Sequence, residues 1–208
     1  MNIYDKLKLI LPSEDAVIIE IGMHYGEDTL RILDIVDSCS YYGFEPDPRN
    51  IKKIQKLGID KKIKFYPIAV SNFVGNTTMF LSSGSLHIND NWTGSSSILQ
   101  PKEHIQHFPW CKFNECVDVH TTTLDCFTKD NNINFVDFIW MDAQGAEYKI
   151  LSKGKETLQN TKYLYFEYYN SEMYSGQKTL TEILYSLGNN WEIIKQYPSD
   201  ILLKNTKL

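Results

Sequence analysis

The clearest indication of the fold class is the stretch Ala16-Val17-Ile18-Ile19-Glu20-Ile21-Gly22-Met23-His24-Tyr25-Gly26. Its opening run is nearly all apolar, as in a parallel-sheet strand that is buried on both faces, and it stops at Gly22. The apolar residues of 27–36 then follow a helical spacing. A buried strand, a glycine turn and a helix in this order are typical of the start of a doubly wound α/β sheet.

The alternation of strand and helix continues toward the C-terminus. Further strands are expected at 41–45, 63–70, 117–120, 136–142 and 162–167, and helices at 48–58, 124–129, from 146 onward and at 179–187. Two closing strands, at 191–196 and 200–204, are joined by Tyr197-Pro198-Ser199, which is short enough to force an antiparallel hairpin. The sequence therefore predicts an α/β fold with a doubly wound, Rossmann-like, mostly parallel sheet that ends in an antiparallel β-hairpin.

One segment interrupts this rhythm. Residues 77–81 are typical of an extra strand, residues 82–97 are rich in Ser, Gly and Asn, and the stretch that follows mixes His with aromatic residues. Long connections of this kind are uncommon in compact domains and often cover a functional site. We therefore expect a single domain over residues 1–208, with an insertion or lid at about 82–115.

Length, composition and charge restrict the function. The chain has 208 residues, 42% of them hydrophobic, and its 21 Lys and Arg against 26 Asp and Glu give a net charge of −5. Because the basic residues form no positive stripe, nucleic acid is not an expected partner. No apolar run approaches the roughly 20 residues of a membrane span, and the first residues lack the form of a signal peptide, so the expected location is cytoplasmic. The cysteines are widely spaced and are expected to be reduced structural thiols.

The turn after the first strand indicates the kind of cofactor. Gly22 and Gly26 let a ligand approach the backbone, but their spacing differs from the G-x-G-x-x-G of a pyrophosphate site. Glu20 and Glu27 place negative charge where a diphosphate would lie, and they suit a ligand that carries an ammonium group.

The end of the second strand adds a candidate ribose contact. Glu45 lies 19 residues past Gly26, where a carboxylate accepts hydrogen bonds from the hydroxyls of an adenosine ribose. A purely structural glycine turn and a carboxylate at a helix N-terminus are the alternatives for these two motifs. Together the motifs favour a positively charged nucleoside without phosphate, and S-adenosylmethionine has those properties.

The sequence at this point resembles the FkbM family of S-adenosylmethionine-dependent methyltransferases, which have the class I methyltransferase fold. The resemblance covers roughly residues 16 to 204. The matching stretches are Ile19-Glu20-Ile21-Gly22 with Gly26 and Thr29, Gly43-Phe44-Glu45-Pro46-Asp47-Pro48, Ala69-Val70-Ser71, Thr123-Leu124-Asp125, and Val136 through Glu147 with Leu151. Trp140 and Gln144 depart from the family pattern, which has a lysine and a glutamate at those positions.

The resemblance implies a set of cofactor contacts on the turns that follow the strands. The implied contacts are Glu20, Gly22 and Gly26 around the methionine end, with Thr29 beside them, Glu45 at the ribose, Ala69, Val70 and Ser71 near the adenine, and Asp142 next to the transferred methyl group. Met23-His24-Tyr25 departs from the small residues usual in the family's first loop, and His24, close to that loop, is a further candidate cofactor contact.

Candidates for action on the acceptor lie at the ends of two later strands. Asp142 and Glu167 are 25 residues apart and end strands that are neighbours in this fold, so their carboxylates are expected to face one crevice and to act in catalysis. With Asn170 they are also candidate ligands of a divalent ion, Mg²⁺ or Mn²⁺, which would lower the pKa of a chelated hydroxyl. Catalysis by positioning without a metal is the alternative.

Four further residues are candidate acceptor contacts. Glu147 lies in the first turn of the helix after Gly145, where it either complements the helix dipole or contacts substrate. His104 lies in the expected lid, and a solvated surface histidine is the alternative. Tyr168 and Tyr174 are expected to stack on a sugar or another flat acceptor face.

These observations predict an S-adenosylmethionine-dependent O-methyltransferase that acts on a hydroxyl group, and the resemblance favours a sugar or glycan as the small-molecule acceptor. A cofactor-binding module without activity is one alternative. An NAD(P)-dependent dehydrogenase is another, since Tyr174 and Lys178 have the Y-x-x-x-K spacing of such enzymes, although the first loop lacks the third glycine. The chain could also be a piece of a larger glycan-modifying enzyme.

Overall fold

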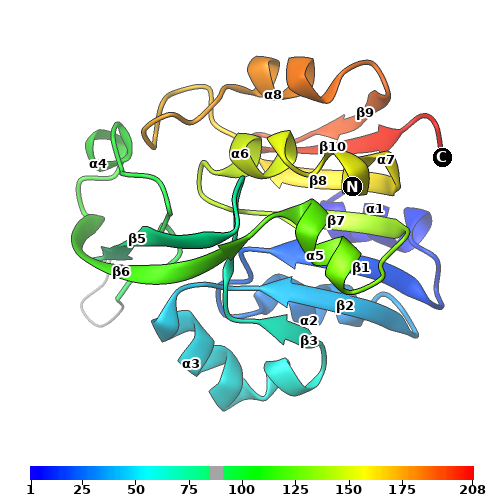
Figure 1. Ribbon diagram of the computed structural model, residues 1–208, viewed down its shortest axis with the longest axis horizontal. Helices are drawn as coiled ribbons and strands as arrows, with labels where there is room; N and C mark the ends of the chain where they lie inside the picture. The colour runs from blue at the N-terminus through cyan, green and yellow to red at the C-terminus, as the bar shows by residue number, and fades with distance from the viewer. Residues whose placement is uncertain (85–90) are drawn as a thin grey trace.

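A seven-stranded sheet forms the centre of the computed structural model, which describes residues 1–84 and 91–208. In spatial order its strands are β3 (Lys64–Tyr66), β2 (Cys39–Phe44), β1 (Ala16–Ile21), β7 (Val136–Met141), β8 (Thr161–Glu167), β10 (Asp200–Asn205) and β9 (Trp191–Gln196). The first five of these run parallel, and β10 is antiparallel to both β8 and β9 (Figure 1). The predicted mostly parallel sheet with a closing antiparallel hairpin is therefore confirmed.

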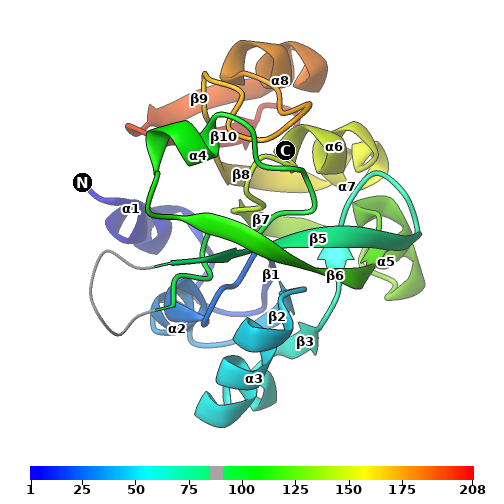
Figure 2. The ribbon, with the colours of Figure 1, turned by 90° about the vertical axis from the view of Figure 1, so that its left-hand side faces the viewer.

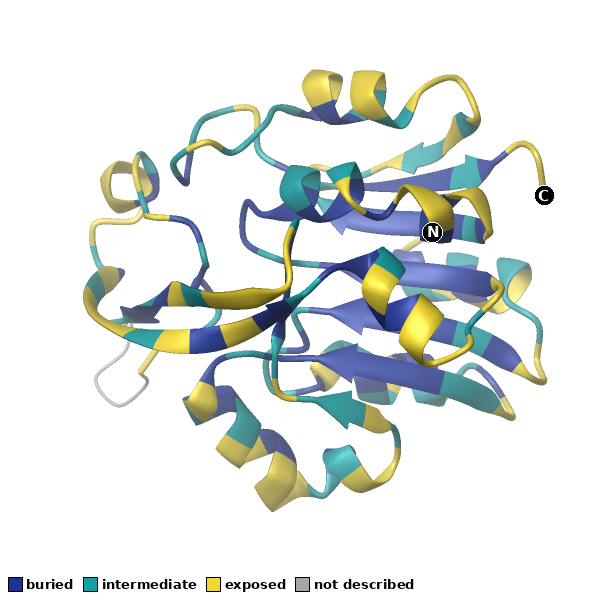
Figure 3. Ribbon diagram, in the orientation of Figure 1, coloured by how far each residue is buried: buried dark blue, intermediate teal, exposed yellow. Residues whose placement is uncertain are grey.

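Helices cover both faces of this sheet. Successive residues of a strand point to opposite faces, so apolar side chains on each face need helices to pack against. In β1, Ile19 and Ile21 belong to one core cluster and Ile18 belongs to another. The first cluster packs under α5 (Leu124–Asp130), α6 (Glu147–Ser152), α7 (Lys155–Gln159) and α8 (Leu180–Leu187), and the second under α1 (Ile3–Ile10) and α2 (Glu27–Leu33). The central strands β1, β7 and β8 are almost wholly buried, whereas β9 at the sheet edge and the outer faces of the helices carry exposed residues (Figure 3).

A third helix, α3 (Pro48–Leu57), continues into the short 3₁₀ helix η1 (Ile59–Lys61) beside the turn that follows β1. Met23 from that turn packs with Ile54 of α3 and Ile59 of η1, so this apolar contact fixes the position of the turn. Among the described residues, no helix has both the length and the apolar character that a membrane crossing requires.

The expected strand at 63–70 is broken. Pro67 has no N–H to donate to a sheet ladder, and the chain leaves the main sheet there. The part before it is β3, and the part after it is β4 (Ala69–Val70), which pairs with β6 (Lys112–Thr122) in a second sheet of order β4-β6-β5. The expected strand at 117–120 also belongs to β6 and is not in the main sheet, so both expectations were wrong in this respect.

The second sheet lies across the carboxyl ends of the parallel strands. β5 (Gly75–Ser83) and β6 pair antiparallel and cross in front of the main sheet when the molecule is viewed from that end (Figure 2). The chain between them includes α4 (His104–His107) and returns close to the ends of β1 and β7. β6 begins at Lys112, so the end of the expected insertion, 112–115, is regular strand.

Two left-handed turns meet at the carboxyl ends of β1 and β7. Gly22 has φ +86°, and a Cβ there would lie 1.8 Å from the backbone oxygen of Asp142. The amide of Asp142 in turn donates to the carbonyl of Ile21 at 2.8 Å. The turn after β7 contains Gln144 at φ +48°, which is uncommon for a residue with a side chain, and Gly145 at φ +92°. The two turns therefore form one close-packed floor.

Candidate functional site

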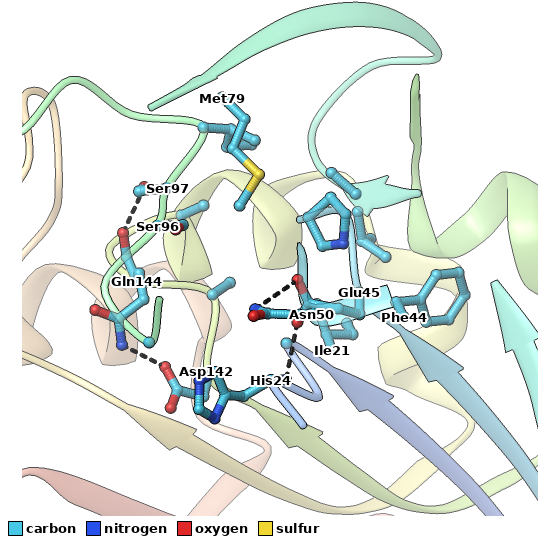
Figure 4. Close-up of a pocket in the computed structure, with 18 of the residues that line it drawn as sticks. Ile21, His24, Phe44, Glu45, Asn50, Met79, Ser96, Ser97, Asp142 and Gln144 are labelled. Atoms are coloured by element: carbon cyan, nitrogen blue, oxygen red, sulfur yellow. Dashed lines mark hydrogen bonds between the residues drawn. The ribbon is translucent and has the colours of Figure 1, made fainter. Parts of the chain in front are cut away.

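A cavity opens above this floor, at the carboxyl ends of β1, β2 and β7, where ligands of open α/β sheets bind. The space between its walls, including the part open to solvent, is about 580 Å³. Figure 4 shows Glu45 and Asn50 on one side, Asp142 and Gln144 on the other, and Met79 above. We call this space the first cavity.

Glu45 lies in this cavity with its carboxylate partly satisfied by protein donors. The backbone amides of His24 and Asp47 donate to its two oxygens, both at 2.8 Å, and the side chain of Asn50 donates at 3.3 Å. A carboxylate has about four acceptor positions, so one is left for a hydroxyl of a bound ligand. Burial raises the pKa of Glu45 to about 8, and hydroxyl donors from a ligand would favour its ionised form.

Asn50 offers a second acceptor beside Glu45. Its side-chain oxygen is buried and has no hydrogen-bond partner among the described residues, and the residue lines the first cavity. An unsatisfied buried polar atom costs free energy unless a ligand or water pairs with it. A vicinal diol such as that of a ribose would supply one hydroxyl to Glu45 and one to Asn50, so the two residues fit the sugar of an adenosine cofactor. Sequence reasoning missed Asn50 because a lone asparagine in a helical stretch gives no signal.

Apolar residues form the rest of the first cavity. Ala69 and Val70 line it as expected, whereas Ser71 does not line it and donates its hydroxyl to Asn72. The further apolar lining residues are Phe44, Pro46, Ile68, Met79 and Ile98. A slot of this kind suits the flat faces of an adenine ring. Met79 and Ile98 come from β5 and the segment after it, which the sequence did not link to the cofactor.

A network of polar side chains fixes that segment over the cavity. Asp47 is fully buried, caps α3 by accepting from the amide of Arg49 at 2.9 Å, and pairs with the Arg49 guanidinium at 2.6 Å. The hydroxyl of Ser96 donates to Asp47 at 2.9 Å, and Arg49 donates to the carbonyl of Ser82 at 2.9 Å. Burial alone would raise the pKa of Asp47, but its hydrogen bonds with Arg49 outweigh this effect and hold the pKa below its ordinary value. Residues 93–98, which line the cavity, are thereby tied to the end of β2.

A second cavity adjoins the first and has an empty volume of about 960 Å³. The two cavities share Gly22, His24, Gly94, Asp142 and Gln144. Aromatic rings of Trp92, Phe108, Trp110 and Tyr169 line the second cavity, together with the carboxylates of Glu27, Asp28, Asp142 and Glu167. Flat aromatic faces beside hydrogen-bond acceptors are suited to a polyhydroxylated ligand.

The boundary between the cavities brings Asp142 and Glu167 together, as the neighbouring strands predict. The amide nitrogen of Gln144 donates to both, at 2.6 Å to Asp142 and at 2.8 Å to Glu167, and the hydroxyl of Tyr169 donates to the other oxygen of Glu167 at 2.8 Å. Burial raises the pKa of Asp142 to about 6, and burial together with the charge of Asp142 raises the pKa of Glu167 well above its ordinary value. The two carboxyl groups therefore hold a shared proton at a higher pH than two isolated carboxylates would.

Glu20 and Thr29 do not line either cavity. Glu20 is buried on the opposite face of β1, where its carboxylate accepts from the hydroxyls of Thr29 at 2.5 Å and Tyr41 at 2.7 Å. Burial raises its pKa to about 8. Direct contact of Glu20 and Thr29 with the methionine end of a cofactor, implied by the resemblance, is not what this geometry supports. Gly26 is also outside both cavities, and its Cα faces the side chain of Ile59.

Three other candidates line neither cavity. Glu147 is buried, lines neither cavity, and accepts from the amides of Ala143 at 2.9 Å and Gly145 at 3.3 Å, so it stabilises the turn that precedes α6. Tyr168 accepts from Gln196 at 2.7 Å and packs against the closing hairpin. Asn170 is exposed and lines neither cavity, so it is not placed with Asp142 and Glu167 as a ligand.

The remaining candidates lie near the boundary. His24 lines both cavities, and its ring nitrogen Nε2 is 3.0 Å from the hydroxyl of Thr93. His104 lines the second cavity and is buried, not a solvated surface residue. Tyr174 is fully buried, and its hydroxyl lies 2.8 Å from the side-chain oxygen of Gln144. Lys178 is paired with Glu182 at 2.9 Å on the surface, which removes the lysine that the dehydrogenase alternative requires beside the tyrosine hydroxyl.

Among residues 1–84 and 91–208, no group of three or more His, Cys, Asp or Glu side chains is arranged to hold a metal ion. Asp142 and Glu167 form a pair, and the third group between them is an amide donor. The expected Mg²⁺ or Mn²⁺ site at Asp142, Glu167 and Asn170 is therefore not formed in this structure.

Comparison with known proteins identifies relatives by sequence and by fold. Residues 20–193 match the family described as the Methyltransferase FkbM domain. The chain is similar to the 2-O-methyltransferase NoeI of Sinorhizobium fredii, with 34% identity over 213 residues that cover 100% of this chain and 87% of that protein.

Two solved structures share the fold. A methyltransferase FkbM from Methylobacillus flagellatus is 14% identical with a TM-score of 0.57, and the match covers 94% of this chain but 45% of that one. The N-terminal domain of EvdMO1, crystallised in the presence of SAH and D-fucose, is 10% identical with a TM-score of 0.51, and the match covers 97% of this chain and 80% of that one.

Proposed function

The chain belongs to the FkbM family of methyltransferases, and on this premise we propose that it transfers a methyl group from S-adenosylmethionine to a hydroxyl of a sugar or glycan. The main support for the proposal is that two adjoining cavities share Asp142 in their linings. One cavity suits a nucleoside, and the other suits a polyhydroxylated acceptor. The 2-O-methyltransferase relative supports the choice of a hydroxyl acceptor.

The first cavity holds the cofactor in this proposal. Glu45 and Asn50 accept hydrogen bonds from the ribose, and the apolar slot around Val70 and Met79 takes the adenine. When bound, S-adenosylmethionine supplies a methyl group on a positively charged sulfur. Asp142 lines both cavities, so its negative charge lies where it stabilises that positive charge and faces the incoming hydroxyl.

The second cavity holds the acceptor. Trp92 and Trp110 offer ring faces to a sugar, and Glu27 and Asp28 accept hydrogen bonds from its hydroxyls. Within the described part of the chain, four carboxylates and no lysine or arginine line this cavity. An uncharged sugar is accordingly favoured over a phosphorylated one, because a phosphate would meet like charge without a basic partner.

Asp142 acts as the proton acceptor in this proposal. Methyl transfer joins the acceptor oxygen to the methyl carbon, breaks the carbon–sulfur bond and releases the hydroxyl proton. Asp142 lines both cavities, whereas Glu167 lines only the second, so Asp142 is the carboxylate that the proton reaches most directly. Most of the rate enhancement then comes from holding the hydroxyl in line with the methyl group.

The test is methyl transfer from methyl-¹³C-labelled S-adenosylmethionine to a panel of neutral glycosides and the corresponding sugar phosphates. We expect a labelled methyl ether on a neutral glycoside, seen by NMR, and weaker or no labelling of its phosphate. Trp110→Ala should raise the KM for the acceptor and leave cofactor affinity unchanged. Tight cofactor binding with no labelled ether from any hydroxyl acceptor would instead favour a binding module without activity.

A further inference from the structure

The side-chain amide of Gln144 lies between the carboxylates of Asp142 and Glu167. Its nitrogen is 2.6 Å from Oδ1 of Asp142 and 2.8 Å from Oε2 of Glu167, so the two N–H groups are directed to one carboxylate each. Its oxygen lies 2.8 Å from the hydroxyl of Tyr174, which donates to it. The same hydroxyl also lies 2.9 Å from the carbonyl oxygen of Ser95, so its single hydrogen is shared between two acceptors. The carboxylates set the orientation of the amide: their oxygens accept, so the amide nitrogen faces them and the amide oxygen faces Tyr174.

The backbone of Gln144 is held as firmly as its amide. The residue adopts φ +48°, a conformation that non-glycine residues rarely adopt, and its side chain is almost fully buried. The hydroxyl of Ser97 donates to its carbonyl at 2.7 Å. The ring of Tyr174 packs directly on Gly145, where a Cβ would approach it to 2.8 Å. Gln144 therefore keeps an uncommon backbone conformation that is held by the Ser97 hydroxyl and by the packing of Tyr174 on the next residue. Residues held in such conformations cluster at functional sites.

Two adjacent, partly buried carboxyl groups are stabilised by a shared proton or by a positive partner, and a divalent cation is the usual metal partner because its preferred ligands are oxygens. Here the amide nitrogen occupies the bridging position and supplies one hydrogen to each carboxylate. The hydroxyl of Tyr169 supplies a further donor to Glu167 at 2.8 Å. The polar hydrogens of Gln144 and Tyr169 thus pair with the carboxylate oxygens that a bridging ion would otherwise coordinate.

We propose that the Gln144 amide stands in for a divalent cation between Asp142 and Glu167, and that this enzyme holds its carboxylate pair without a metal ion. Gln144 is a positioning residue that acts through the two carboxylates. The inference rests on the proposed function for its role in methyl transfer, whereas the exclusion of a metal from this place is a property of the protein alone.

The first test measures Mn²⁺ binding by electron paramagnetic resonance on the wild-type protein and on Gln144→Glu, which puts a third carboxylate at the bridging position. We expect no Mn²⁺ bound at micromolar concentration by the wild type and one bound Mn²⁺ per chain in the variant. Glu167→Gln added to Gln144→Glu should remove the new site. Stoichiometric Mn²⁺ on the wild type that Asp142→Asn abolishes would overturn the proposal, as would a folded Gln144→Glu protein that binds none.

The second test separates positioning from a merely structural role and also serves if Gln144→Glu does not fold. Gln144→Met keeps the side-chain length and removes both donors, so we expect kcat to fall roughly ten- to hundredfold with the affinity for S-adenosylhomocysteine unchanged. Wild-type activity should be unaffected by a chelator. Loss of wild-type activity on chelation, restored by Mg²⁺ or Mn²⁺, would overturn the proposal. Binding of S-adenosylhomocysteine and Mn²⁺ needs no acceptor, so failure of the proposed function leaves the first test interpretable.

Discussion

Glu20 and Glu45 are both buried glutamates close to strand ends, yet Glu45 reaches a cavity and Glu20 does not. The reason is the pleat of β1. Ile19 and Ile21 face the core under α5 and α6, so Glu20 faces the other side and meets α2 at Thr29. The alternation along this strand could have placed Glu20 correctly from the sequence alone.

The packing of the two turns at the floor of the site depends on Gly22. Gly22→Ala adds a Cβ 1.8 Å from a backbone oxygen of Asp142 at a left-handed φ of +86°. Gly176→Ala is the matched control, since Gly176 has φ +80° and open space around its Cα. We expect the control to lose about 1–2 kcal/mol of unfolding free energy in urea denaturation, which is the cost of the left-handed conformation. Gly22→Ala should lose clearly more, and equal losses would show that the turns do not pack as described.

At the scale of elements, the junction of β2 and α3 does two things. It presents Glu45 to the first cavity, and through Asp47 it holds the segment that closes that cavity. The segment has no regular secondary structure at residues 93–96, so its position depends on side-chain hydrogen bonds from Asp47, Arg49 and Ser96. A segment without the backbone hydrogen bonds of a helix or sheet depends on a few polar side-chain contacts, so the loss of any one of them is expected to increase its local opening.

Asp47→Ala removes the cap of α3 and the anchor of Ser96 together. We expect a loss of about 1–3 kcal/mol in unfolding free energy, from the cap and from the unpaired buried donors that remain. Hydrogen exchange should become faster at the amides of Ser96 and Ser97, which bond Thr93 and Phe80, and stay unchanged in β9. Asp118→Ala, at an exposed position of β6, should alter neither quantity. Unchanged exchange at 93–97 in the Asp47 variant would mean that the segment is held by other contacts.

How far the site could be predicted depended on which element carries each residue. Asp142 and Glu167 were placed correctly because parallel neighbouring strands end at the same edge of a sheet. Met79 was missed because the sequence did not show that the strand at 77–81 lies over the site, and Ser96 was missed because it belongs to an insertion with no periodic pattern. The strand at 63–70 was predicted as one piece because its apolar pattern outweighed Pro67, whose missing N–H ends the ladder.

At the scale of the whole molecule, the fold buries several glutamates without a basic partner in contact. Burial raises the pKa of Glu20, Glu45 and Glu147 to about 8 each. In the unfolded chain these groups have an ordinary pKa near 4.5, so the folded state holds protons that the unfolded state releases. Their contribution to stability is complete below about pH 4.5 and is lost as the pH rises through about 8.

Thermal unfolding of the ligand-free protein should therefore give a higher Tm at pH 5.5 than at pH 8.5. Glu20→Gln should flatten this dependence, because the glutamine cannot ionise and its oxygen still accepts from Thr29. Glu192→Gln, at an exposed position of β9, should leave it unchanged. A Tm that rises from pH 5.5 to 8.5 would contradict the account of buried, protonated glutamates.

In the proposed enzyme the first cavity binds the cofactor and the second binds the acceptor. Calorimetric titration with S-adenosylhomocysteine tests this assignment on the wild type, on Glu45→Gln and on Trp110→Ala. We expect one site per chain, an affinity that falls roughly ten- to hundredfold in Glu45→Gln, and an affinity within about twofold of wild type in Trp110→Ala. Affinity retained in Glu45→Gln and lost in Trp110→Ala would contradict the assignment of the two cavities.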